Sequence, residues 1–303
     1  MSINSLFINP QKSLINNFIL GVISGKDLFL KMNAVNFQKK ETPKIYILMS
    51  IDCDVFTDSY ALKRINDIFS KKNIKISIAA TAKLVEENVE FYDDFLSNGH
   101  ELVNHGYSLH SDVDEAGKTY STFFYNKVDW NFIEKEILNA QEAFYKLFKI
   151  DVKGFRAPHF GVFQGKEEIL KLYDILYNFN FNYSSSVMVY NMLRNNWQFF
   201  SNKIIELPVT NRVILPYSVI DSYSLVYKQG LLKCKDKFYK EFKRALDVAA
   251  SSKHDMFINI YFDPSQMLHN KELEMSIDYV FEKLPKSKFE FLTYSKFIDK
   301  IKG

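Results

Sequence analysis

The sequence of 303 residues lacks most features of secreted and membrane-spanning proteins. Only two cysteines occur, Cys53 and Cys234, so neither a disulfide framework nor a thiolate metal cluster can form, and the count fits a reducing compartment. The longest apolar run near the N-terminus, residues 18–23, is far shorter than the roughly 20 residues of a membrane span and lacks a basic leader and a cleavage site. We therefore expect a soluble, cytoplasmic protein without a membrane span.

The sequence also has no large excess of positive or negative charge. The 39 Lys and Arg residues stand against 36 Asp and Glu, which leaves a net charge of +3. No block of five or six like charges appears, so no nucleic-acid partner is expected. Aromatic residues, in contrast, make up 16% of the chain, which fits a ring-rich core or a site where sugar rings stack on aromatic side chains. Core packing is the simpler of these two explanations.

From residue 44 onward, short β-branched runs alternate with amphipathic helical stretches, a pattern typical of a parallel sheet with crossover helices. Strands are predicted at residues 44–50, 75–81, 100–104, 152–156, 181–186, 203–207, 256–262 and 288–292. Helices are predicted from about Ser59, at 82–97, 129–149, 165–178, 236–252 and 271–283, and at the C-terminus. Residues 105–128 show no periodicity and are predicted to form a long loop. We predict one domain over residues 41–303, preceded by a helical N-terminal extension, residues 1–40.

Polar side chains gather at the ends of predicted strands, where reacting groups collect in parallel α/β proteins. Asp52 and Asp54 flank Cys53 at the first strand end, and the two-residue period of a strand puts both carboxylates on one face. Such a pair could divide its work between metal binding and proton transfer. A turn-forming Asp and a helix cap are the alternative interpretation.

Three further clusters add imidazole, guanidinium and carboxyl groups. His105 and His110 begin the long loop, in a chain with only six histidines, and imidazole with carboxylate suits zinc or a similar divalent ion. Arg156 ends a strand and can hold a carboxylate ionised through a bidentate pair. Asp263 ends the strand at 256–262. Taken singly, each histidine could be a surface residue and Arg156 an ordinary partner in a salt bridge.

Together these clusters resemble the motifs of the polysaccharide deacetylase family, the NodB-like carbohydrate esterases, over about residues 44–300. Residues 50–54 (SIDCD), 99–106 (GHELVNHG) and 155–161 (FRAPHFG) follow one another in the family's order. The resemblance implies a distorted (β/α) barrel and metal-dependent hydrolysis of the acetamide of an N-acetylated sugar.

The resemblance also implies a role for most of these residues. Asp54, His105 and His110 would bind the divalent ion, with zinc the expected metal. Asp52 would be the catalytic base and Arg156 its orienting partner.

Two positions depart from the family's pattern. The family spaces its histidines four residues apart, whereas His110 follows His105 by five, so either the loop bulges by one residue or His110 is not a ligand. Asp263 stands where the family has a histidine as the general acid. A carboxyl group can protonate a leaving amine only if burial or a neighbouring negative charge raises its pKa.

Three functions therefore stay open. The first is N-deacetylation of a carbohydrate precursor, such as a nucleotide- or lipid-linked sugar. The second is hydrolysis of another linear or cyclic amide in the same superfamily, because the spaced form of the first motif is similar to that branch. The third is a non-catalytic metal- or sugar-binding relative, which Asp263 favours and the presence of Asp52, Asp54, His105 and Arg156 together opposes. An oligomer is compatible with all three.

Overall fold

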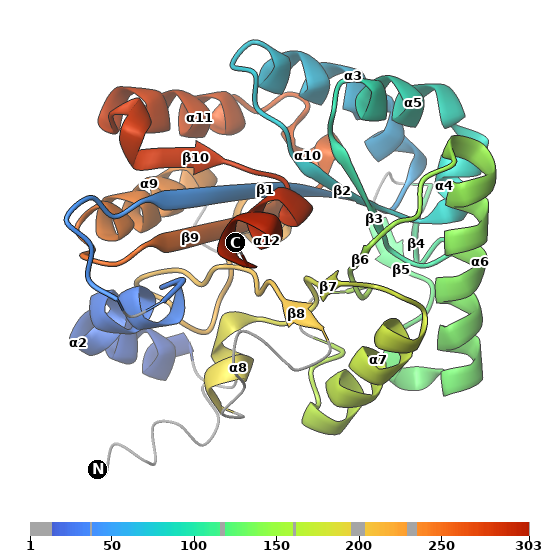
Figure 1. Cartoon of the computed structure of the whole chain (residues 1–303), viewed down its shortest axis with the longest axis horizontal. Coiled ribbons are helices and arrows are strands. Elements are labelled where there is room, and N and C mark those ends of the chain that lie inside the picture. The colour runs from blue at the N-terminus through green and yellow to red at the C-terminus, as the bar shows by residue number, and fades with distance from the viewer. Residues whose placement is uncertain are drawn as a thin grey trace.

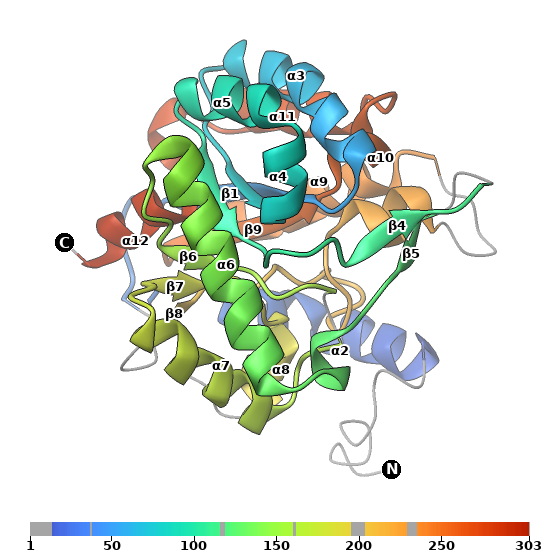
Figure 2. The same ribbon diagram turned by 90° about the vertical axis from the view of Figure 1, so that its right-hand side faces the viewer.

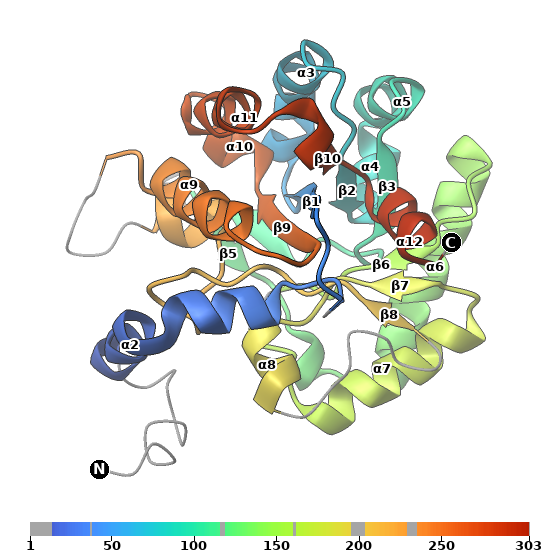
Figure 3. The ribbon, with the colours of Figure 1, turned by 60° about the vertical axis from the view of Figure 1, so that its left-hand side comes forward.

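A curled parallel sheet with helices packed around its outside forms the fold (Figures 1 and 3). The computed structural model describes residues 14–36, 38–115, 119–159, 162–194, 204–228 and 235–302. Parallel strands joined by crossover helices place all their carboxyl ends at the same end of the sheet. That end carries the side chains that the sequence singles out.

Eight strands form the sheet, and their pairings are parallel. They are β1 (Ile45–Cys53), β2 (Ser77–Ala80), β3 (Glu101–Asn104), β6 (Gly154–Phe155), β7 (Tyr183–Ser184), β8 (Ile205–Glu206), β9 (Met256–Phe262) and β10 (Phe289–Phe291). The central strand is β1, which pairs with β9 on one edge and with both β10 and β2 on the other. From β2 the sheet continues through β3, β6 and β7 to β8.

The sheet closes on itself between β9 and the segment that follows β8. Thr210 donates its backbone N–H to the carbonyl of Asn259 in β9 at 2.7 Å, and Thr210 Oγ1 accepts the N–H of Asn259 at 2.8 Å. A parallel bridge joins Asp221 to Tyr261 farther along β9. These contacts confirm the distorted (β/α) barrel that the sequence predicts.

Amphipathic helices cover the sheet. They are α2 (Leu14–Met32), α3 (Phe56–Ser70), α4 (Ala82–Glu87), α5 (Val89–Ser97), α6 (Trp130–Phe148), α7 (Lys166–Asn178), α8 (Val189–Arg194), α9 (Lys237–Ala250), α10 (Pro264–Met267), α11 (Glu272–Lys283) and α12 (Tyr294–Lys302). Short 3-10 turns at Tyr125–Lys127 and Lys286–Lys288 and a π-helical turn at Tyr223–Tyr227 complete the structure. Helix α6 shows the principle: Asp129 caps it by accepting the N–H of Phe132, and its apolar stripe is buried.

Two helical predictions differ from the structure in detail. The helix predicted over residues 82–97 is interrupted at Asn88, whose Nδ2 donates to the carbonyl of Leu84 at 2.8 Å and ends α4 there. Helix α3 begins at Phe56, before Ser59, because the carboxylate of Asp58 accepts a backbone N–H ahead of the first turn.

The predicted loop at residues 105–128 also contains regular structure. A hairpin of β4 (Ser111–Val113) and β5 (Thr119–Ser121) lies outside the parallel sheet (Figure 2). Its strands are too short to show periodicity, so the sequence alone does not reveal them. The strand predicted at 203–207 is β8, and Lys203 lies outside the described residues.

Helix α2 belongs to the predicted N-terminal extension, of which residues 1–13 lie outside the described part. Gly21 and Gly25 let α2 approach the backbone of Val213 and Ile214 closely, since a Cβ at Gly21 would lie 1.8 Å from the carbonyl oxygen of Ile214. The division of the chain near residue 40 stays a prediction. Among the described residues, no helix is both long enough and apolar enough to cross a membrane.

Candidate metal and catalytic site

The C-terminal end of β1 opens onto a cavity of 340 Å³. Asp52 and Asp54 both line this cavity, while Cys53 between them is fully buried in the hydrophobic core. The two-residue period of the strand therefore places both carboxylates on one face, as predicted.

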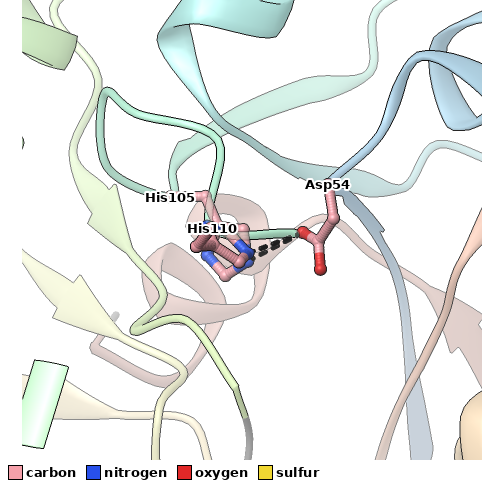
Figure 4. A group of neighbouring side chains, drawn as sticks. All are labelled: Asp54, His105 and His110. Atoms are coloured by element: carbon pink, nitrogen blue, oxygen red, sulfur yellow. Dashed lines mark ion pairs between the residues drawn. The ribbon is translucent and has the colours of Figure 1, made fainter. Parts of the chain in front are cut away.

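Asp54 lies against the two histidines of the long loop (Figure 4). Its Oδ1 is 3.3 Å from His105 Nε2 and 2.9 Å from His110 Nε2. Potential ligand atoms of the three residues all lie within 4.8 Å of one another. The five-residue spacing thus brings His110 into the same cluster as His105.

The cluster fits a divalent ion. His105 Nδ1 donates to the carbonyl of Arg156 at 2.7 Å, which leaves Nε2 as the ring nitrogen with a free lone pair. Asp54 Oδ1 and both ring nitrogens of His110 are buried, and among the described residues none of them makes a hydrogen bond of regular geometry, although Asp54 Oδ1 lies in ion-pair contact with both histidines. Buried polar atoms without regular hydrogen bonds are costly, and a bound cation would satisfy Asp54 Oδ1 and His110 Nε2.

Electrostatics in the cluster favour a carboxylate. Burial alone would raise the pKa of Asp54, but the charges of His110 and His105 hold it well below its usual value. Burial alone would lower the pKa of His105, but the neighbouring Asp54 carboxylate has the larger effect and raises this pKa.

Asp52 is held by a fully buried guanidinium. Arg156 Nη1 donates to Asp52 Oδ1, while its Nε donates to the carbonyl of Ser185 at 3.1 Å and its Nη2 to Ser185 Oγ at 3.0 Å. The hydroxyl of Tyr294 also contacts Nη2 and donates to Asn259 Oδ1 at 2.8 Å. These bonds fix the guanidinium from several strands, so it can orient the Asp52 carboxylate toward the cavity.

Glu136 of α6 positions the histidine loop, a role that the sequence did not predict. Its Oε2 accepts the N–H groups of Tyr107 and Ser108 at 3.1 and 2.8 Å, and its Oε1 accepts Ser108 Oγ at 2.7 Å. Gly106 turns the chain with a φ of +88°, a left-handed conformation that favours glycine. The signal in the sequence is a glutamate within the apolar stripe of a helix, directly before Ile137.

Asp263 also lines the cavity, at the end of β9. Burial raises the pKa of its carboxyl group well above the usual value, and the neighbouring carboxylates of Asp58, Asp54, Asp52 and Asp221 raise it further. Gln266 Nε2 donates to Asp263 Oδ2. The structure therefore places a weakly acidic carboxyl group at the position expected for a general acid.

Asp58 links the two sides of the cavity, and the sequence did not predict this role either. Its Oδ2 accepts the N–H groups of Asp54 and Val55 at 3.1 and 3.2 Å. Its Oδ1 accepts the N–H of Ser265 at 3.1 Å and Ser265 Oγ at 2.5 Å. Burial raises the pKa of Asp58 to about 6. An acid in the first turn of a predicted helix is typical of an ordinary helix cap, so the sequence alone does not predict this bridging role.

His159 closes another side of the cavity. Its Nε2 lies 3.1 Å from the carbonyl oxygen of His110 and 3.0 Å from that of Phe123. Burial and the adjacent His110 lower the pKa of His159 to about 4, so the ring is neutral. Phe160 and Gly161, the end of the same sequence motif, lie outside the described residues.

Residues 39–174 match the model of the polysaccharide deacetylase family. The chain is therefore similar to the polysaccharide deacetylase family over these residues, which make up less than half of its length. The matched range contains the aspartates of β1, both histidines and Arg156, and it ends well before Asp263. No curated protein sequence matches the chain.

Solved structures share the barrel of this chain. A polysaccharide deacetylase homologue of Mycobacterium smegmatis is 14% identical with a TM-score of 0.64, over 89% of this chain and 93% of that one. The Puue allantoinase is 12% identical with a TM-score of 0.64, over 88% and 93%. A pseudoenzyme of carbohydrate esterase family 4 from Bacillus anthracis is 14% identical with a TM-score of 0.51, over 87% and 68%. Identities this low establish the fold alone.

Proposed function

We propose that the protein is a metal-dependent N-deacetylase that hydrolyses the acetamide of an N-acetylated sugar in a carbohydrate precursor. The observation that carries the proposal is the buried cluster of Asp54, His105 and His110 beside the Asp52 carboxylate and its fixed guanidinium partner. Metal ligands close to a carboxylate base are the groups that amide hydrolysis needs.

Asp54, His105 and His110 would hold the ion, for which zinc is the expected metal because the donors are imidazole and carboxylate. The chemistry that a divalent ion supplies in such a site is polarisation of the amide carbonyl and activation of water. Asp52 accepts the proton of the attacking water, since its carboxylate lines the cavity and Arg156 keeps it oriented.

Asp263 supplies the proton that the leaving amine needs. Its raised pKa keeps the carboxyl group protonated at a higher pH than an ordinary aspartic acid, so it can donate where a free carboxylate could not. The hydrogen bond from Gln266 fixes its orientation. This assignment supports a working enzyme in spite of the departure from histidine.

Release of acetate tests the proposal. The purified protein, loaded with zinc, should release acetate from at least one member of a panel of N-acetylated sugars, and Asp52→Asn should abolish the release. Allantoin and other cyclic or linear amides form the second arm of the assay. Hydrolysis of those amides without acetate release would show a different amidase, and no hydrolysis in either arm would overturn the proposed catalysis.

A further inference from the structure

Helix α2 exposes an apolar face that the fold does not use. Four of its large apolar side chains are between 41% and 74% exposed, namely Phe18, Ile19, Val22 and Ile23. Their spacing of one and four residues makes them neighbours over two turns of the helix, and we call them the α2 patch. No other helix that the structure describes exposes more than two large hydrophobic side chains.

The inner face of α2 is already occupied by the protein itself. Asn17 Oδ1 accepts the N–H of Tyr217 at 3.2 Å, Gly21 lies against the backbone of Ile214, and Phe29 is fully buried. These positions recur at multiples of four residues, so they mark the side of the helix that packs on the barrel. The N-terminal half of α2 is therefore apolar on its outer side as well, which is typical of a helix that is covered on both sides.

Positive charge gathers beside the α2 patch. Helix α9 packs against α2, and the two helices lie on the same flank of the molecule (Figures 2 and 3). Residues 228–250, which end with α9, contain seven Lys and Arg against three Asp and Glu, an excess larger than the net charge of +3 of the whole chain. Helix α2 adds two lysines against one aspartate. This flank is thus both apolar and basic.

Several of these basic groups have no carboxylate partner. Glu241 and Asp247, the two carboxylates within α9, already form ion pairs at 2.6 to 3.1 Å. Lys235 and Lys237 at the start of α9 form no ion pair with any described residue. Lys26 follows the α2 patch by one turn and is exposed. A lysine there can lay its alkyl stem along an apolar surface and keep its ammonium group in a polar layer.

From these two features we infer that the α2 patch docks on an anionic lipid membrane, with its apolar side chains among the headgroups and the nearby lysines facing lipid phosphates. Helices that lie in the membrane interface bind in this way, through buried apolar area and electrostatic attraction to anionic lipids. The inference concerns attachment of the protein and does not depend on the proposed reaction.

A second copy of the chain fits the α2 patch less well. Four partly exposed side chains offer well under the roughly 800 Å² that each partner buries in a stable dimer. A two-fold axis at the patch would also bring two basic α9 helices toward each other, and like charges across an interface are unfavourable. An anionic surface complements both the charge and the small apolar area.

Flotation of the full chain with lipid vesicles tests the inference. The protein should bind vesicles of phosphatidylglycerol and phosphatidylcholine and should bind phosphatidylcholine alone much less, and added salt should weaken the binding. Val22→Ser and Ile23→Ser should each weaken it roughly five- to tenfold, because each removes a partly exposed apolar side chain. Leu170→Ser is the matched control, since Leu170 is exposed on α7, away from α2 (Figures 1 and 3).

Two further sets of variants separate charge from insertion. Lys235→Gln and Lys237→Gln should each weaken binding to the anionic vesicles roughly fivefold, whereas Lys166→Gln on α7 should not. The tryptophan added by Ile23→Trp should be quenched by lipids that carry bromine on their acyl chains. The tryptophan added by Leu170→Trp should not be quenched.

The inference is overturned if the wild type binds neither kind of vesicle, or if Ile23→Ser leaves the binding unchanged. Analytical ultracentrifugation examines the other occupant. A wild-type dimer that does not bind vesicles and that Ile23→Ser dissociates would assign the α2 patch to a second copy and overturn membrane docking. Acetate release from a soluble sugar should be the same in Ile23→Ser and in the wild type, so failure of the proposed reaction and failure of this inference are distinguishable.

Discussion

The two sides of the cavity are built differently. On one side, β1, β3 and the end of β6 supply the aspartates, the histidine loop and Arg156, all within the residues that match the family model. On the other side, β9 and α10 supply Asp263, Ser265 and Gln266, beyond the matched residues. The first side carries the residue types that the resemblance implies, whereas the second carries a carboxyl group where the resemblance implies a histidine.

The difference shows two ways to obtain a reactive group. Arg156 and the histidine loop depend on geometry, because fixed hydrogen bonds from buried groups hold them in place. Asp263 depends on its electrostatic surroundings, because burial and four neighbouring carboxylates turn an ordinary acid into a weak one. Removing one partner should therefore have a large effect on the first side and a graded, pH-dependent effect on the second.

Loss of a metal ligand should have the largest effect. Each ligand variant should lose more than roughly 10–100-fold in zinc affinity, which is the loss typical of changes at residues that hydrogen-bond to metal ligands. These variants are Asp54→Ala, His105→Ala and His110→Ala. Their activity should disappear with the metal. Elemental analysis and titration with zinc measure this. His269→Ala, a change at an exposed histidine, should keep full occupancy. Full occupancy in His110→Ala would show that the five-residue spacing excludes that residue as a ligand.

Replacing the base should separate catalysis from metal binding. Asp52→Asn should lower kcat by roughly 10²–10⁴-fold, because the amide cannot accept a proton, while zinc content stays the same. The exposed Asp93→Asn serves as a control for the loss of one negative charge. Wild-type turnover in Asp52→Asn would eliminate the proposed role of this carboxylate.

The sequence predicts the first side of the site well because parallel strands bring their carboxyl ends together. Asp52 and Asp54 are far from His105 and Arg156 in the chain, yet all four lie at or directly after the end of a strand, so their convergence is expected. Whether His110 could join them is not visible in the spacing. That depends on the backbone of the loop, which Gly106 and a glutamate from a separate helix shape.

The second side is less accessible to sequence reasoning. Asp263 is identifiable as a departure from a motif, but its pKa depends on carboxylates from other parts of the chain, which no local pattern reveals. The hairpin that carries Tyr120 is missed for a related reason, since each of its strands has only three residues. Tertiary contacts rather than periodicity define both features.

A change at Asp263 tests the electrostatic side. A raised pKa means that the donor is protonated below that pKa, so wild-type activity should fall as the pH rises through it. Asp263→Asn should lower kcat by about 10²-fold, at the lower end for a lost acid, and should remove this alkaline limb. Zinc content should not change. A variant with wild-type kcat and the same pH profile would assign the proton to another donor.

Removal of the hydrogen bond between Ser265 and Asp58, which joins the two sides of the cavity, should have the smallest effect. Ser265→Ala removes the hydroxyl that donates to the buried Asp58 Oδ1 at 2.5 Å, while the backbone N–H of residue 265 remains. Burial raises the folded pKa of Asp58 to about 6, so the fold loses stability as the pH rises from the unfolded value of about 4 to about 6, and the Ser265 bond reduces this loss. The free energy of unfolding should therefore fall by about 1.5–3 kcal/mol at pH 8, where Asp58 is ionised, and by only about 0.5–1.5 kcal/mol at pH 5.

Urea denaturation at both pH values measures the difference, with the exposed Ser251→Ala as control. An equal loss at the two pH values would show that the strength of the bond does not depend on the charge of Asp58.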